Sequence, residues 1–184
     1  MNYSEYKVSR NLAWEILINE QITQLPISVS DICKHMGIQI KYYIPDDDNS
    51  GFSVIVDSAP VIFISKSERP LRQRFTAAHE LGHILLGHVG KYQLVNREPS
   101  NTDNPIEQSA NVFASRLLAP ACVLWGCRVE NAEDISALCQ ISKQAAEYRM
   151  ERMKILYERG KFLTSDLERQ VYRNFQGYIE ANRL

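Results

Sequence analysis

Hydrophobic side chains recur at intervals of three and four residues in two stretches near the middle of the chain. The apolar positions of the first stretch are Leu71, Phe75, Ala78, Leu81 and Leu85. Those of the second stretch are Ile106, Ala110, Phe113 and Leu117. This spacing places side chains along one face of a helix, and each stretch opens with a proline, which suits a first helical turn. The pattern predicts two helices, each with one buried face.

The region before these helices has the periodicity of β-strands. Ile38, Ile40 and Tyr42 alternate with outward-facing positions, which is typical of a half-buried strand. Two runs rich in β-branched residues, 52–56 and 61–64, are separated by a turn sequence and indicate a hairpin. A helix is predicted over residues 4–20, and a shorter helix that opens at residues 28–31 and ends at Gly37 precedes the strands. We therefore expect an α+β fold with a small antiparallel or mixed sheet.

The chain after Pro120 is predicted to be helical. Residues 131–138 and 141–158 are each predicted to form a helix that opens at a capping residue, Asn131 and Ser142, and one more helix is expected from Thr164 onward. Residues 134–146 resemble a helix-turn-helix element. Such an element indicates contact with DNA or with a repressor, or else two helices that only pack over the core. We favour packing, because acidic and basic residues offset each other along the second helix.

The sequence His79-Glu80-Leu81-Gly82-His83 lies inside the first predicted helix and has the composition of a metal site. Residues four apart lie on one helical face, with Cβ atoms about 5–6 Å apart, so both imidazoles can bind one ion. Glu80 would sit beside the metal as the general base for the attacking water. A solvated helix face is the alternative, but a chain with four histidines rarely contains this motif by chance.

Two residues are candidates for a third metal ligand. His88 lies five residues after His83, about 140° further around a helix, so we expect it to point away from the pair. Glu107 lies in the first turn of the second helix and would leave one coordination position open, although it could simply complement the helix dipole. Asn111, one turn later, is expected to accept a hydrogen bond from His79 or His83.

These motifs resemble those of a known family. Residues 74–88 look like the central motif of the ImmA/IrrE family of metallopeptidases, and residues 107–120 are similar to its second motif, with glutamate as the third ligand. The resemblance covers roughly residues 28–120. It implies a zincin-like core in which a small sheet flanks two metal-binding helices, followed by a C-terminal helical extension that is similar to a helix-turn-helix.

The resemblance also implies a zinc-dependent endopeptidase. Its cofactor would be Zn2+ or another divalent metal, held by His79, His83 and Glu107, with Glu80 as the catalytic base and Asn111 as a supporting residue. The implied substrate is a protein, a helix-turn-helix repressor of the XRE type that is cut to relieve repression. The alternative is a non-catalytic metal-binding or DNA-binding regulatory protein that acts through protein contact. The open ligand position and the presence of Glu80 argue against that alternative.

Composition limits the partners of the chain. Its 184 residues suit a peptidase core over residues 1–120 and a helical extension over 121–184 that packs on the core. With 21 basic and 22 acidic residues, the net charge is −1, so direct DNA binding is not expected. The sequence contains neither a signal peptide pattern nor an apolar run of about 20 residues, which predicts a cytoplasmic protein without membrane contact. The spacing of the four cysteines predicts free thiols.

Overall fold

The computed structural model describes residues 2–46, 49–90 and 104–183. The chain divides into two compact units, one formed by Met1–Ser9 and Ser28–Ala114 and the other by Arg10–Ile27 and Ser115–Leu184. Two helices contribute residues to both units, α1 (Tyr3–Asn19) and α4 (Pro105–Leu118). Among the described residues, no helix combines the length and the apolar character that crossing a bilayer requires.

The first unit contains a three-stranded sheet and its helices. Its remaining elements are α2 (Val29–His35), β1 (Gln39–Tyr43), β2 (Gly51–Val56), β3 (Ala59–Ser65) and α3 (Pro70–Leu85). The strand order is β1-β3-β2, with β1 parallel and β2 antiparallel to β3. The predicted α+β fold is therefore confirmed, and its sheet is mixed.

The hairpin between β2 and β3 is closed by a two-residue turn. Asp57 and Ser58 have φ angles of 49° and 66°, and Val56 pairs with Ala59 on either side of them. Positive φ at both central positions is the geometry of a type I′ turn, whose twist matches that of the strands. This turn fixes the register of the hairpin, which places Ser53 opposite Ile62.

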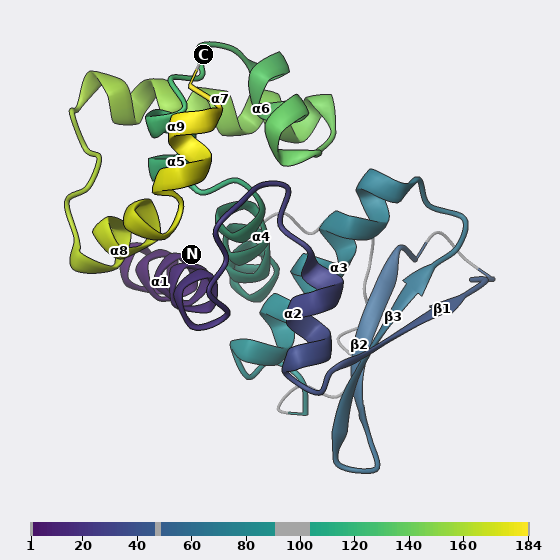
Figure 1. The fold of residues 1–184 in the computed structure, drawn as a ribbon. Coiled ribbons are helices and arrows are strands. Elements are labelled where there is room, and N and C mark those ends of the chain that lie inside the picture. Colours follow the sequence, from purple (N-terminus) through teal and green to yellow (C-terminus); the bar gives the residue numbers. More distant parts are fainter. Residues whose placement is uncertain (1, 47–48, 91–103, 184) are drawn as a thin grey trace. The chain divides into compact units, whose positions relative to one another are not determined.

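Helix α3 packs against β2 and β3, and α2 packs against α3 and β1 (Figure 1). Gly51 permits the close contact between β2 and α3. A Cβ atom at this position would lie 2.5 Å from Thr76 Cγ2 and 2.6 Å from the carbonyl oxygen of Phe63. Glycine therefore brings the start of β2 directly against the middle of α3.

Two positions predicted to be buried are exposed. Tyr42 is 54% exposed and Leu71 is 42% exposed. On β1 the apolar contacts are made by the neighbouring Tyr43, which faces the other side of the sheet and packs its ring against Phe52 and Phe63. On α3 the buried segment begins only at residue 76, so the first turn remains accessible.

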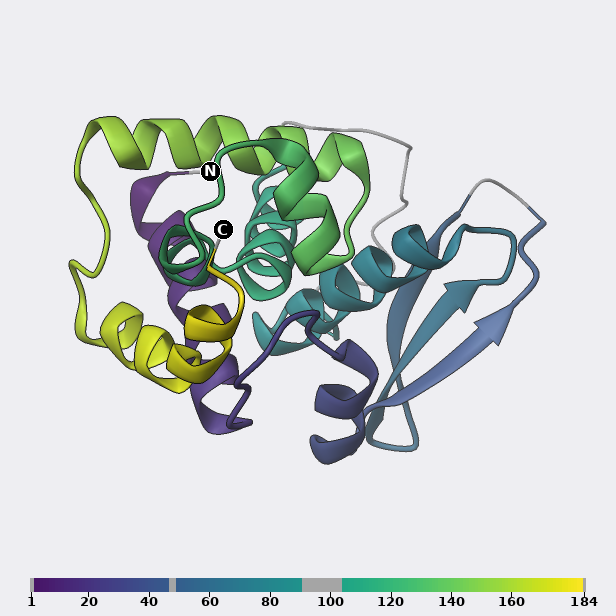
Figure 2. The same cartoon turned by 45° about the horizontal axis from the view of Figure 1, so that its top comes forward.

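The second unit is helical, as predicted for the chain after Pro120. Its further elements are α5 (Ala121–Gly126), α6 (Ala132–Cys139), α7 (Lys143–Glu158), α8 (Asp166–Asn174) and α9 (Gln176–Ala181) (Figure 2). The helix pair expected at residues 131–158 is present as α6 and α7, capped by the side chains of Asn131 and Ser142. Helix α5 was not predicted. The single helix expected after Thr164 is wrong, because the chain forms two helices that meet at the buried Phe175.

All four cysteines are buried and free, as the sequence predicted. Burial raises the pKa of the Cys33 thiol to about 12 and that of the Cys127 thiol to about 11. Because the thiolate is the reactive form, these side chains behave as small apolar residues in the two units.

A Gly51→Ala substitution tests the contact between β2 and α3. The added methyl group would overlap a backbone oxygen that cannot rotate away, so we expect a loss of about 1–3 kcal/mol in the free energy of unfolding. Gly177→Ala is the control, because its Cβ would meet no atom within 4 Å and alanine favours a helix by up to about 1 kcal/mol. Urea unfolding measures the stability of both variants, and an unchanged stability of Gly51→Ala would contradict the described packing of β2 on α3.

Candidate active site

His79 and His83 lie one turn apart on the buried side of α3. Pro70 occupies the first turn of this helix, and His83 lies in its last turn. Their side chains are 13% and 7% exposed, and their Nε2 atoms are 2.9 Å apart. The two Nε2 atoms therefore point toward one location.

Glu107 approaches this location from α4. The side chain of Asn104 accepts a hydrogen bond from the backbone N–H of Ile106, so the helix is capped three residues before Glu107. Its Oε2 lies 3.2 Å from His79 Nε2 and its Oε1 lies 3.4 Å from His83 Nε2. Hydrogen bonds with His79 and His83 hold the pKa of the Glu107 carboxyl well below its usual range.

The donor atoms of His79, His83 and Glu107 all lie within 4.8 Å of one another. Within the described parts of the chain, this is the one group of three such side chains able to hold a metal ion. Two donors that bind a tetrahedral zinc ion at about 2.0–2.1 Å are about 3.3 Å apart, close to the separations in this group. Imidazole nitrogen and carboxylate oxygen are also ordinary zinc ligands, so the residues fit a divalent metal.

The two helices that carry these donors meet at Gly82. A Cβ atom on Gly82 would lie 2.9 Å from Cδ1 of Phe113, and 3.3 Å from its Cβ and Cγ. Phe113 is fully buried, so its ring has little room to move away. The missing side chain of Gly82 thus sets the distance at which Glu107 faces the histidines.

Glu80 is buried between α3 and the sheet, with 1% of its surface exposed. Ser53 on β2 donates a hydrogen bond to Glu80 Oε2 at 2.8 Å. This serine was not identified from the sequence, because its role depends on the register of β2 beside α3. The carboxylate that we expect to act as the base is therefore held from the neighbouring strand.

The Asn111 side chain meets His79 rather than His83. Its Oδ1 lies 3.0 Å from His79 Nδ1, the ring nitrogen opposite to the one that faces Glu107. An imidazole whose Nε2 binds a metal carries its proton on Nδ1 and donates it. The geometry therefore permits the hydrogen bond that the sequence analysis expected for this asparagine.

The sequence predicted that His88 points away from the histidine pair, and this prediction is wrong. Its Nδ1 lies 3.0 Å from Nδ1 of His83. The extrapolation of helical angles fails because α3 ends at Leu85, and Gly87 then takes a φ of +70° and turns the chain back. His88 remains outside the group of three donors, since it faces the outer nitrogen of His83.

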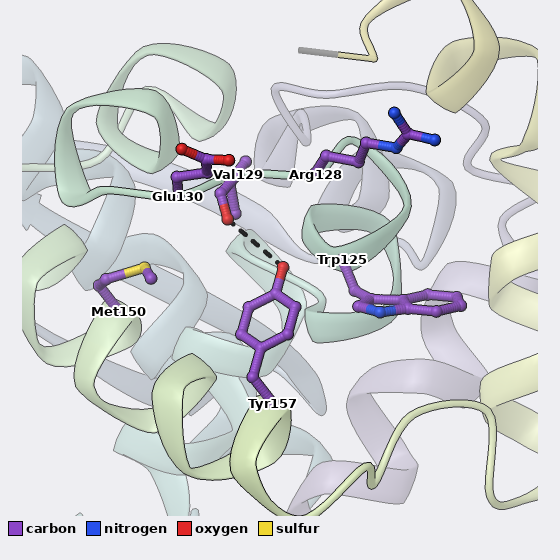
Figure 3. A pocket seen from close by; sticks show the side chains of 6 residues that line it. All are labelled: Trp125, Arg128, Val129, Glu130, Met150 and Tyr157. Atoms are coloured by element: carbon purple, nitrogen blue, oxygen red, sulfur yellow. Dashed lines mark hydrogen bonds between the residues drawn. The ribbon is translucent and has the colours of Figure 1, made fainter.

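A separate pocket of about 460 Å³ lies within the second unit (Figure 3). Its lining residues are Trp125, Arg128, Val129, Glu130, Met150 and Tyr157. Tyr157 donates a hydrogen bond to the carbonyl oxygen of Val129 at 3.3 Å. None of these residues belongs to the unit that holds the histidines, and a single carboxylate is no metal site.

Comparison with known proteins identifies the family. A peptidase family model described as the IrrE N-terminal-like domain matches residues 33–151, more than half of the chain. The chain belongs to this family. The matched residues include the whole of the candidate site and extend beyond the roughly 28–120 expected from the motifs, through α5 and α6 into α7.

Two curated relatives of the IrrE type share part of the sequence. The radiation response metalloprotease IrrE of Deinococcus radiodurans is 36% identical over 88 residues, which cover 46% of this chain and 27% of that protein. The protein of the same name from Deinococcus deserti is 34% identical over 90 residues, 46% of this chain and 31% of the relative. The chain thus matches less than a third of the length of either relative.

A Glu107→Ala substitution tests the third donor. Removing the only carboxylate of the group leaves two imidazoles, so we expect the loss of tight zinc binding while the fold persists. Zinc content after dialysis, measured by atomic emission, is the readout, and Gln108→Ala on the same helical turn is the control. One tightly bound zinc per chain in Glu107→Ala would show that the third ligand is another residue.

Proposed function

We propose that the chain is a zinc-dependent endopeptidase in which His79, His83 and Glu107 hold the metal and Glu80 acts as the base. The observation that carries the proposal is the convergence of two imidazole nitrogens and one carboxylate, together with the buried carboxylate of Glu80, the residue that follows His79 on α3. Membership of a peptidase family supports the same chemistry. A purely structural metal site has no need of that second carboxylate.

When bound, the metal would polarise the scissile carbonyl and lower the pKa of water. The work of the protein is then to move a proton. Glu80 would accept a proton from the attacking water and pass it to the departing amine. Its proton-accepting carboxylate must face the reacting atoms throughout, and the hydrogen bond from Ser53 to Oε2 restrains it in one orientation.

We further propose that an extended segment of the substrate lies alongside β2. This strand pairs with β3 on one side and forms the end of the strand order. An exposed sheet edge can add a peptide as a further strand through backbone hydrogen bonds. Ser53 ties β2 to Glu80, so a peptide on this edge would run past the base.

The proposed substrate is a helix-turn-helix repressor, as the family resemblance implies. Because a metallopeptidase cuts an extended backbone, the target bond must lie in a loop, a linker or a locally unfolded helix. Backbone pairing carries little sequence information, so selectivity requires docking of the repressor elsewhere. The second unit offers an exposed aromatic anchor in Tyr148 of α7, which is 66% exposed, and tyrosine is enriched where partners bind.

A Glu80→Gln substitution tests the catalytic assignment. Glutamine retains the size of the side chain and can still accept the hydrogen bond from Ser53, but it cannot accept a proton at neutral pH. We expect normal zinc content and a decrease of about 10²–10⁴-fold in the rate of cleavage. Single-turnover cleavage of a helix-turn-helix repressor encoded beside the gene is the assay.

Undiminished cleavage by Glu80→Gln would assign the base to another residue. Zinc binding without any cleavage by the parent protein, across candidate repressors and casein, would favour a regulatory protein that acts through contact alone.

A Tyr148→Ala substitution tests docking on the second unit. We expect normal zinc binding and slow cleavage of the repressor, because truncation of an aromatic hot spot costs an interface about 2 kcal/mol or more. Tyr3→Ala is the matched control, since Tyr3 is 75% exposed and belongs to the other unit. Casein should be cut poorly by all three proteins, and rapid digestion of casein would instead indicate a degradative peptidase.

A further inference from the structure

We infer that His88 is a positioning residue for the metal site and acts through His83. The inference rests on the proposed metal-binding function. His88 contributes no donor to the group formed by His79, His83 and Glu107. Its ring instead meets that of His83, with Nδ1 atoms 3.0 Å apart and ring planes inclined at 66°.

The direction of this hydrogen bond follows from the orientation of His83. Its Nε2 faces Glu107 and the Nε2 of His79, so Nε2 is the atom available to a metal. A neutral imidazole that binds through Nε2 carries its hydrogen on Nδ1. His83 must therefore donate and His88 must accept, which places the hydrogen of the His88 ring on Nε2.

The other histidine of the pair has a matching arrangement. His79 Nδ1 lies 3.0 Å from the Oδ1 atom of Asn111, the same separation as that between His83 and His88. Each metal-facing imidazole thus has an acceptor on its outer nitrogen, an amide in one case and an imidazole in the other. Such outer partners fix the tautomer and the orientation of a ligating ring and increase its basicity.

The backbone after α3 holds His88 in this place. The N–H of Gly87 bonds to the carbonyl of Ile84 at 3.1 Å, and the N–H of His88 bonds to the carbonyl of His83 at 2.9 Å. With Gly87 at a φ of +70°, these bonds form a Schellman motif. His88, which follows Gly87, therefore lies beside the last turn of α3, next to His83.

The test compares the zinc affinity of four proteins by competition with a chelator. His88→Ala removes the acceptor, and we expect its affinity to fall about 10–100-fold. His88→Asn replaces Nδ1 with an amide oxygen at nearly the same place, as in the natural pair formed by Asn111 and His79, so its affinity should remain within a few-fold of the parent. His35→Ala is the control, because His35 is an exposed histidine at the end of α2.

Two further measurements separate positioning from folding. Urea unfolding of the metal-free proteins reports whether His88→Ala is folded. The visible absorption of bound Co2+ reports the geometry of the ligands, and we expect a changed spectrum for His88→Ala and a parent-like spectrum for His88→Asn. A loss of affinity without rescue by asparagine, or a spectrum unaffected by His88→Ala, would overturn the inference and leave the metal site standing.

Unchanged zinc affinity in a folded His88→Ala protein would also overturn the inference about His88. A parent protein that binds no zinc would refute the proposed metal site itself, and with it the role of His88. The two failures are distinguishable because only the second affects the parent.

Discussion

Helices α3 and α4 can bring their donor atoms to one ion because Gly82 has no side chain where the two helices meet. A methyl group there would lie 2.9 Å from the ring of the buried Phe113. Glycine inside a helix costs about 1 kcal/mol relative to alanine, so some helix stability is given up for this approach. The separations between Glu107 and the two histidines, 3.2 Å and 3.4 Å, depend on it.

Three polar contacts then restrain the side chains of the candidate site, each from a different part of the first unit. Ser53 on β2 holds Glu80, Asn111 on α4 holds His79, and His88 after α3 meets His83. A functional side chain whose rotamer is locked by its neighbours loses less freedom when it binds a metal or a substrate. The sheet, the second helix and the turn after α3 thus each contribute to preorganising the site.

The parts that could be predicted from the sequence are those that depend on local periodicity. The spacing of His79 and His83 is a property of one helix, and the caps of α6 and α7 lie within a few residues of the side chains that form them. Three-dimensional relations could not be predicted in this way. The contact of Ser53 with Glu80 depends on hairpin register, and the position of His88 depends on a left-handed glycine that ends the regular helix. The exposure of Tyr42 depends on which face of the sheet holds the aromatic cluster.

Local charge gives the strongest physical reason to expect a divalent cation at this place. Glu80 is almost completely buried on α3, and the partly buried Glu107 on α4 lies 3.2 Å and 3.4 Å from the Nε2 atoms of His79 and His83. A carboxylate that is removed from water is costly unless it is paired or coordinates a metal ion. A divalent cation would be such a partner for Glu107, whose carboxylate faces the same location as the Nε2 atoms of His79 and His83.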